Sequence, residues 1–330
     1  MRATYGRRLI GFAAGVVAVV ACLAVWIVQP IFGQRPRDVT ERVEPAVLQR
    51  QVEYLTASLG QRQFFRPATL ERTARYIENA FAEAGGRVAA QAFEVEGQRY
   101  RNIEVSFGPE HGRPVIVGAH YDVEENTLGA DDNASGVVGL LELARALGRN
   151  PPRVPVRLVA FTLEEPPYFG TDAMGSRRYV AELRGRGLEP RLVLVLEMIG
   201  YFDAREGSQA YPLPGLGWLY PVRGDYIALV GNLTSVSLVR RVKGVMRSAT
   251  TLPVQSINAP TWIPGIDFSD HASFWAAGMP ALMVTDTAFY RNPHYHRSSD
   301  LPNTLDYPRM AQVVEAVLAV VRQFDNDGTS

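Results

Sequence analysis

Short, continuous apolar runs recur along the chain and are separated by stretches with helical periodicity. The runs at residues 114–119 (PVIVGA), 156–162 (VRLVAFT) and 192–196 (LVLVL) have the composition and length of buried strands. The other strands expected are an antiparallel pair joined by a Glu96–Gly97 turn and two later runs, namely residues 87–95, 99–107, 226–230 and 281–284.

Between the strands, apolar residues spaced three and four positions apart predict helices. These helices are expected at residues 41–59, 70–84, 135–147, 175–183, 235–248 and 308–324. Thr69 is expected to cap the second helix and Ser135 the third. Strands that alternate with helices predict an α/β fold: a mostly parallel, mixed central sheet with helices on both faces, in a single domain over residues 41–330.

Residues 9–28 form an uncharged apolar run that is long enough to cross a bilayer as one helix. Arginines precede it and favour a cytoplasmic N-terminus, and Trp26 suits the far interface. We therefore expect residues 1–40 to comprise a cytoplasmic tail, a single transmembrane anchor and a linker, with the domain on the periplasmic or extracellular side of the cell membrane. The alternative is a signal peptide whose cleavage leaves a secreted domain.

Composition narrows the chemistry that the domain can carry. The 330 residues are 47% hydrophobic and have a formal net charge of zero, so a sizeable core is possible and nothing favours a nucleic-acid partner. Cys22 is the only cysteine, which excludes an internal disulfide and a thiolate metal cluster. Any metal ion must therefore be held by nitrogen and oxygen ligands.

Acidic and imidazole side chains stand where predicted buried strands end. The residues at strand ends are His120, Glu164, Glu165 and Glu197. The loop after residue 120 adds Asp132, and a C-terminal loop adds His294 and His296. Open α/β sheets bind ligands at the carboxyl ends of their strands. Carboxylates gathered there repel one another, and burying them unpaired costs several kcal/mol each. Since no basic residue adjoins these strand ends, divalent cations are the economical explanation.

Counting charges favours two ions. Asp132, Glu165 and Glu197 bring three negative charges and a bridging hydroxide brings a fourth, which two divalent ions balance. Zinc accepts imidazole and carboxylate ligands, and two zinc ions about 3.5–4 Å apart lower the pKa of a shared water. A remaining carboxylate, Glu164 or its neighbour, is then free to accept the proton of that water as general base.

The ordered set GAHYD, GADDNASG, LEE, GSRRYV, LEMIG, SDHASFW and HYHRSSD resembles the M28 family of zinc-dependent exopeptidases, of the aminopeptidase Y and leucine aminopeptidase type. The resemblance runs from about residue 68 to the last helix, and it implies the zinc-exopeptidase (phosphorylase/hydrolase-like) fold. The ligands it implies are His120 and Glu197 for one zinc ion, Glu165 and His296 for the other, and Asp132 as a bridge between both.

The resemblance also implies two roles beside the ligands. Glu164 would be the general base, and Asp122 would accept the second ring N–H of His120 and fix its tautomer. The family carries a cis peptide after the bridging aspartate, which falls at residues 132–133 here. Two departures are visible: Glu197 stands where the family often has Asp, and the loop at residues 166–172 replaces a short Gly-rich turn.

The function expected is therefore a di-zinc metallo-aminopeptidase that acts on peptides. A single zinc ion or another divalent metal is the alternative for the cofactor. For the function, the alternatives are a mono-zinc acyltransferase similar to glutaminyl cyclase and a catalytically silent, receptor-like homologue. Three further polar sites have structural interpretations: Asp131 as support of its loop, His294 as a loop or pocket residue, and Asp270 as a helix cap beside His271.

Overall fold

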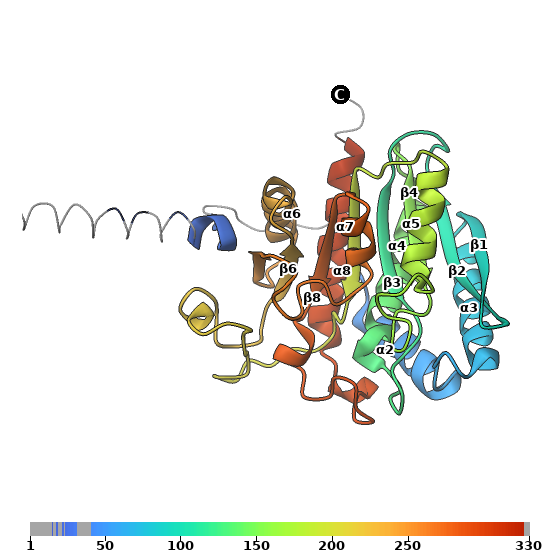
Figure 1. Ribbon diagram of the computed structural model, residues 1–330, viewed down its shortest axis with the longest axis horizontal. Helices are drawn as coiled ribbons and strands as arrows, with labels where there is room; N and C mark the ends of the chain where they lie inside the picture. Colours follow the sequence, from blue (N-terminus) through green and yellow to red (C-terminus); the bar gives the residue numbers. More distant parts are fainter. Residues whose placement is uncertain (1–14, 16–17, 19–21, 23, 32–40, 327–330) are drawn as a thin grey trace, which may run out of the picture.

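An eight-stranded sheet forms the centre of the domain, with the strand order β1-β2-β4-β3-β5-β8-β6-β7 (Figure 1). The structure is a computed structural model that describes residues 15, 18, 22, 24–31 and 41–326. The strands are β1 (Arg87–Val95), β2 (Gln98–Phe107), β3 (Val115–His120), β4 (Val156–Phe161), β5 (Leu192–Glu197), β6 (Ile227–Gly231), β7 (Val254–Asn258) and β8 (Ala281–Thr285).

The pairing of these strands is mixed but mostly parallel, as predicted. Strands β4, β3, β5 and β8 are parallel neighbours, and β6 is parallel to β7. Antiparallel pairing occurs between β1 and β2, between β2 and β4, and between β8 and β6. The predicted hairpin is present, with Val95 opposite Gln98 at its turn.

Helices cover both faces of the sheet. They are α2 (Pro45–Glu53), α3 (Pro67–Glu83), α4 (Gly136–Arg149), α5 (Gly175–Gly185), α6 (Val236–Ala249), α7 (His271–Ala276) and α8 (Tyr307–Asn326). α2, α3, α4, α6 and α8 pack on one face, and α5 and α7 pack on the other. This arrangement confirms the predicted α/β architecture.

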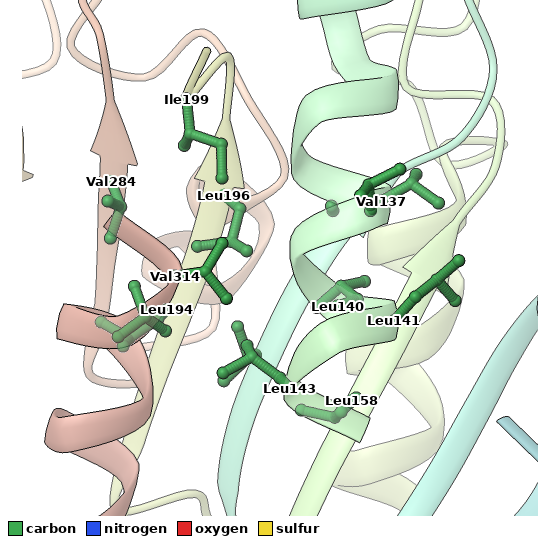
Figure 2. Packing of buried hydrophobic residues seen from close by; sticks show 14 of the residues in the cluster. Val137, Leu140, Leu141, Leu143, Leu158, Leu194, Leu196, Ile199, Val284 and Val314 are labelled. Atoms are coloured by element: carbon green, nitrogen blue, oxygen red, sulfur yellow. The ribbon is translucent and has the colours of Figure 1, made fainter. Parts of the chain in front are cut away.

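Alternate residues of the central strands supply the two cores. Val115 and Val117 of β3 join the core under α4 and α8, whereas Ile116 between them joins the core under α5 and α7. Figure 2 shows the larger core, in which α4 lies against β4, β5 and α8. The labelled residues are Val137, Leu140, Leu141, Leu143, Leu158, Leu194, Leu196, Ile199, Val284 and Val314. Full burial of each such side chain contributes about 1.5–3 kcal/mol, so the strand ends rest on a rigid base.

Several element boundaries differ from those expected. α3 begins at Pro67, where proline suits the first helical turn, so Thr69 lies inside the helix and does not cap it. Ser135 occupies the N-cap of α4, but its hydroxyl donates to the carbonyl of Asp131 instead of capping. The first predicted helix begins at Pro45 and ends in a π-helical turn, Tyr54–Ser58. Strand β7 was not predicted, because its polar residues interrupt the apolar run.

Most of the predicted membrane anchor, residues 9–28, lies outside the described residues. Among the residues that are described, no helix has the length and apolar character needed to cross a bilayer. The end of that segment nevertheless contacts the domain, because the Val28 carbonyl accepts a hydrogen bond from Lys243 on α6 at 2.8 Å.

Candidate metal centre

The topology explains why three strand ends meet. From β3 the chain passes through α4 to β4 on one side of β3, and then through α5 to β5 on the other side. Connections that diverge in this way open a crevice at the carboxyl ends of the strands. His120 ends β3, Glu197 ends β5, and Glu164 and Glu165 closely follow β4. All four side chains are buried.

Asp132 lies between two groups of possible ligands. Its Oδ1 is 3.3 Å from Nε2 of His120, and that nitrogen is also 3.3 Å from Oε2 of Glu197. Its Oδ2 is 3.2 Å from Nε2 of His296, which is 3.4 Å from Oε2 of Glu165. The structure thus brings the five predicted ligands together, with one carboxylate oxygen facing each group.

Two of these atoms are buried without a hydrogen-bond partner among the described residues. They are Nε2 of His120 and Oδ1 of Asp132. A buried polar atom without a partner carries a desolvation cost of about 1–3 kcal/mol, which a bound ion would offset. Imidazole nitrogen and carboxylate oxygen are both zinc ligands. The residues present therefore fit a metal ion at this position.

The electrostatics of the cluster also favour added positive charge. Burial, together with the nearby carboxylates of Asp132 and Glu164, raises the pKa of Glu165 well above its usual range. Burial and Glu197 likewise raise the pKa of Glu164, against the opposing effect of His120. Burial lowers the pKa of His120, but the carboxylates of Glu197 and Glu164 outweigh it and hold that pKa well above 6.5. Without a cation, the cluster therefore retains protons.

Taken three at a time, the donors form two other close sets. Ligand atoms of His120, Asp132 and Glu165 lie within 4.8 Å of one another, and so do those of Glu124, Glu165 and His296. Glu197 belongs to neither set, although it lies close to His120. A carboxylate shared by two ions needs only one oxygen near each, and Asp132 meets that requirement with Oδ1 near His120 and Oδ2 near His296. Glu124 is a partly exposed residue that the sequence did not single out.

The loop that carries Asp132 is fixed by polar contacts on both sides. The Asp300 carboxylate accepts the backbone N–H groups of Asp131 and Asp132 at 2.9 and 3.1 Å. The side chain of Asn133 donates to the carbonyl of Leu196 at 2.8 Å, next to the end of β5. The peptide bond between residues 132 and 133 is cis, as the resemblance implied.

Asp122 does not make the contact that was expected of its carboxylate. The ring Nδ1 of His120 is 3.2 Å from the main-chain carbonyl of Asp122, whereas the carboxylate Oδ1 is 3.8 Å away. The carboxylate instead accepts the backbone N–H groups of Glu164 and Glu165, at 3.2 and 3.1 Å. The loop between residues 120 and 122 turns so that the carbonyl lies nearer the ring. Asp122 therefore orients His120 through its backbone and the two glutamates through its side chain.

Two residues at the centre were missed by the sequence analysis. Arg62 is 1% exposed and donates hydrogen bonds to the carbonyls of Leu55, Tyr121, Leu128 and Gly129. Burial lowers its pKa to about 10, against the opposing pull of Asp300 and Asp122, so it remains charged at neutral pH. Ser269 donates to Oε2 of Glu197 at 2.6 Å. Arg62 carried no sequence signal, because it lies in a connection far along the chain from its partners. Ser269 is the first residue of the SDHASFW motif, but the motif alone did not indicate its contact with Glu197.

The remaining polar residues support the loops around the centre. The Asp131 carboxylate accepts the N–H of Gly200 and the side-chain amide of Asn292, and so braces its loop. Nδ1 of His294 is 2.9 Å from the Ser299 hydroxyl and makes a loop contact. Asp270 occupies the N-cap position of α7, but its side chain makes no capping hydrogen bond, which corrects the expected role.

An apolar pocket adjoins the centre at Glu197. It encloses about 100 Å³, and its lining includes Tyr211, Tyr220 and Tyr226. Glu197 is the one charged residue among the described residues that line it. Residues 209–212 and Tyr220 thus supply part of a pocket next to the predicted metal ligands. Tyr295 also lines the pocket, and its ring stacks on His296 with the centroids 3.8 Å apart.

Comparison with known proteins places the chain in a family. The model of peptidase family M28 matches residues 102–321. The chain belongs to peptidase family M28. The match covers β3, β4 and β5, the Asp132 loop and the C-terminal loop, and therefore every predicted ligand. The resemblance drawn from the motifs is confirmed.

Individual relatives extend the comparison. An Escherichia coli K12 protein named YfbL and described as uncharacterized is 46% identical over 84% of this chain and 87% of its own length. A probable leucine aminopeptidase of Arthroderma otae is 26% identical over 70% of this chain, and the chain spans 58% of the length of that relative. Family and relatives support the class that was expected, a zinc-dependent exopeptidase.

Solved structures show the same fold. BSAP, a zinc aminopeptidase from Bacillus subtilis, aligns with a TM-score of 0.67 at 15% identity, over 85% of this chain and 95% of its own. A glutaminyl cyclase from Tannerella forsythia aligns with a TM-score of 0.64 at 21% identity, over 86% and 99%. The fold is therefore shared by proteins named for two different reactions. The reaction of this chain must be inferred from its site residues and not from the fold.

Proposed function

We propose that this M28 metallo-aminopeptidase uses two zinc ions to release N-terminal residues from peptides. The observation that carries the proposal is the position of Asp132, whose two oxygens face separate donor pairs at 3.3 and 3.2 Å. His120 and Glu197 would hold one ion, and His296 and Glu165 the other. Three ligand carboxylates and a bridging hydroxide would then balance the charge of both ions. When bound, the ions would polarise the scissile carbonyl and lower the pKa of a shared water toward about 7.

Glu164 is the residue best placed to move the proton. Its Oε2 is 3.9 Å from Nε2 of His120, beside the ligands but without a ligand contact of its own to Asp132. Its backbone N–H donates to the Asp122 carboxylate, which fixes the main chain from which the Glu164 side chain extends. We therefore assign Glu164 as the general base that accepts the proton of the attacking water and returns it to the leaving amine.

The apolar pocket would receive the side chain of the N-terminal residue. Glu197 at its edge links the pocket to the ligand cluster, which would place the scissile carbonyl between them. An apolar wall without a basic residue in its lining favours neutral, aliphatic or aromatic side chains. The protein is expected to prefer such residues over Asp, Glu, Lys or Arg in this position.

A mono-zinc acyltransferase is the competing enzyme, because a glutaminyl cyclase has the same fold. The complete set of five donors argues for two ions and hence for hydrolysis. A silent homologue is disfavoured by the same set. Metal analysis and a glutamine-terminated peptide separate these possibilities: about two zinc ions per chain and no cyclised product support the proposal, and one ion with cyclisation would refute it.

The decisive activity test uses purified full-length protein and short peptides with an N-terminal Leu. Release of that residue should stop on addition of a chelator and return with zinc. Glu164→Gln should retain wild-type zinc content and lose roughly 10²–10⁴-fold in kcat, the usual contribution of a general base. An exposed carboxylate offers the matched control, since Glu125→Gln should behave as wild type. Wild-type rates from Glu164→Gln would remove this residue from its role.

We also propose that residues 9–28 anchor the protein in the cell membrane with the peptidase domain exported. The support is the uncharged apolar run in the sequence. Membrane flotation of the full-length chain, combined with protease accessibility of the domain in intact cells, tests this location. A protein recovered shortened at its N-terminus in the medium would favour the secreted form instead.

A further inference from the structure

An uncharged loop exposes large apolar side chains beside the site. Residues 211–222 (YPLPGLGWLYPV) contain no charged residue. Trp218, in the short helix η3 (Leu216–Trp218), is 92% exposed, and Leu219 beside it is 44% exposed. Leu213 and Val222 of the same loop are also exposed. A cluster of this kind on one loop indicates a surface that is covered by something apolar.

The same end of the molecule carries the segment that follows the proposed anchor. In Figure 1 the helical turn of residues 24–28, in dark blue, and the loop of residues 211–222, in yellow, both project from the end of the sheet at β6. Val25 and Trp26 of that turn are 51% and 38% exposed. Two separate apolar surfaces therefore lie at one end of the domain.

Hydrogen bonds to β7 fix these two segments relative to each other. The Ser256 hydroxyl donates to the carbonyl of Val28 at 3.0 Å, and Lys243 donates to the same carbonyl. The carbonyl of Ser256 accepts the Tyr220 hydroxyl at 2.7 Å. Gln29 adds a contact at 2.6 Å to Asn258 at the end of β7. Ser256 is therefore held by the end of the anchor segment through its side chain and by the loop through its backbone.

We infer that the loop of residues 211–222 rests on the bilayer surface, with Trp218 and Leu219 in the interfacial region. This inference rests on the proposed anchor and not on the proposed catalytic reaction. A chain that leaves the bilayer near residue 28 and is pinned at once to Ser256 keeps the domain close to the membrane. Tryptophan is enriched at the membrane interface, where its ring is buried and its N–H stays hydrated. The pocket, which Tyr211 and Tyr220 of this loop also line, then opens close to the membrane surface.

The test uses the full-length chain in vesicles of phosphatidylcholine and phosphatidylglycerol, with and without lipid brominated along its acyl chains. Brominated lipid quenches the fluorescence of tryptophans in contact with the bilayer. Trp26 and Trp218 are the two that the inference places there, so Trp218→Phe should lose about half of the lipid-dependent quenching. Trp275 provides the matched control, because its indole N–H donates to the Ala281 carbonyl inside the protein. Trp275→Phe should lose none of that quenching.

Each outcome is decisive. Equal quenching of wild type and Trp218→Phe overturns the inference, as does failure of the full-length chain to float with the vesicles. If the emission of Trp218 instead changes with protein concentration in the absence of brominated lipid, a second copy of the chain covers the loop. That result would also overturn the inference. Trp218 lies outside the described lining of the pocket, so hydrolysis of a soluble aminoacyl substrate should be unchanged in Trp218→Phe. Loss of catalysis in every sample would instead refute the proposed function and leave the quenching result standing.

Discussion

Replacing Arg62 by Met should destabilise the domain more than any surface substitution. The guanidinium is buried and donates to four carbonyls, two of which, those of Leu128 and Gly129, belong to the loop that leads into Asp132. Methionine fills a similar volume but satisfies none of these acceptors. The substitution therefore removes the donors and leaves the acceptors buried.

The expected magnitude follows from the hydrogen bonds. Each bond from a charged donor is worth roughly 1.5–3 kcal/mol, but the values do not add, and part is offset by the cost of burying the charge. That cost is visible in the pKa of Arg62, which burial lowers to about 10. We expect the free energy of unfolding to fall by about 4 kcal/mol, within the range of about 3–5 kcal/mol for breaking a buried charged contact. For a domain of this size, that corresponds to a fall in Tm of about 8 °C.

Calorimetry and urea unfolding of the metal-free protein measure this effect. Arg62→Lys keeps the charge but cannot reach four carbonyls from one nitrogen, so it should show an intermediate loss. Arg75, whose side chain is 71% exposed, offers the control: Arg75→Met should change stability by less than about 0.5 kcal/mol. Equal stability of Arg62→Met and Arg75→Met would refute the claim that Arg62 holds the loop that leads into Asp132.

Three further predictions test the metal centre. His296→Ala should lose about one zinc ion per chain by metal analysis, whereas His294→Ala should retain both; equal losses would contradict the choice of His296 as ligand. Gly129→Ala should destabilise the protein and weaken zinc binding, because residue 129 has φ +60° and an added methyl group would clash with the backbone oxygen of Asp132. Normal zinc affinity in a folded variant would contradict this close approach. The stability of the metal-free protein should fall as the pH rises from about 5 to 8. Burial raises the pKa values of Asp270 and Asp300 to about 7. Each of these carboxyl groups therefore binds its proton more tightly in the folded state than in the unfolded state. The stabilisation from proton binding is complete below the unfolded-state pKa of 3.8 and is lost as the pH passes through 7. A Tm that rises between pH 5 and 8 in thermal unfolding scans would contradict this prediction.

Local patterns were sufficient to predict the central strands and the residues at their ends. The runs before His120 and Glu197 are apolar on both faces, as strands covered by helices on two sides must be. A charged residue directly after such a run has few structural explanations, so the candidate metal ligands were accessible from the sequence. Strand β7 was not, because only alternate residues of it are buried, and its pattern is weaker than that of the central strands.

Local sequence patterns predict the α/β architecture, the order of the elements apart from β7, and which acids and imidazoles stand at the strand ends. The three-dimensional fold sets how these groups divide. Asp132 faces both donor pairs, and Asp122 uses its carboxylate for the glutamate backbone and its carbonyl for His120. The fold also places Arg62 in contact with the loop that leads into Asp132. The physical reason is that apolar periodicity is a local property of the chain. Hydrogen bonds and charge pairs form between segments far apart in sequence. Which groups meet depends on the paths of the loops, and no local pattern encodes those paths.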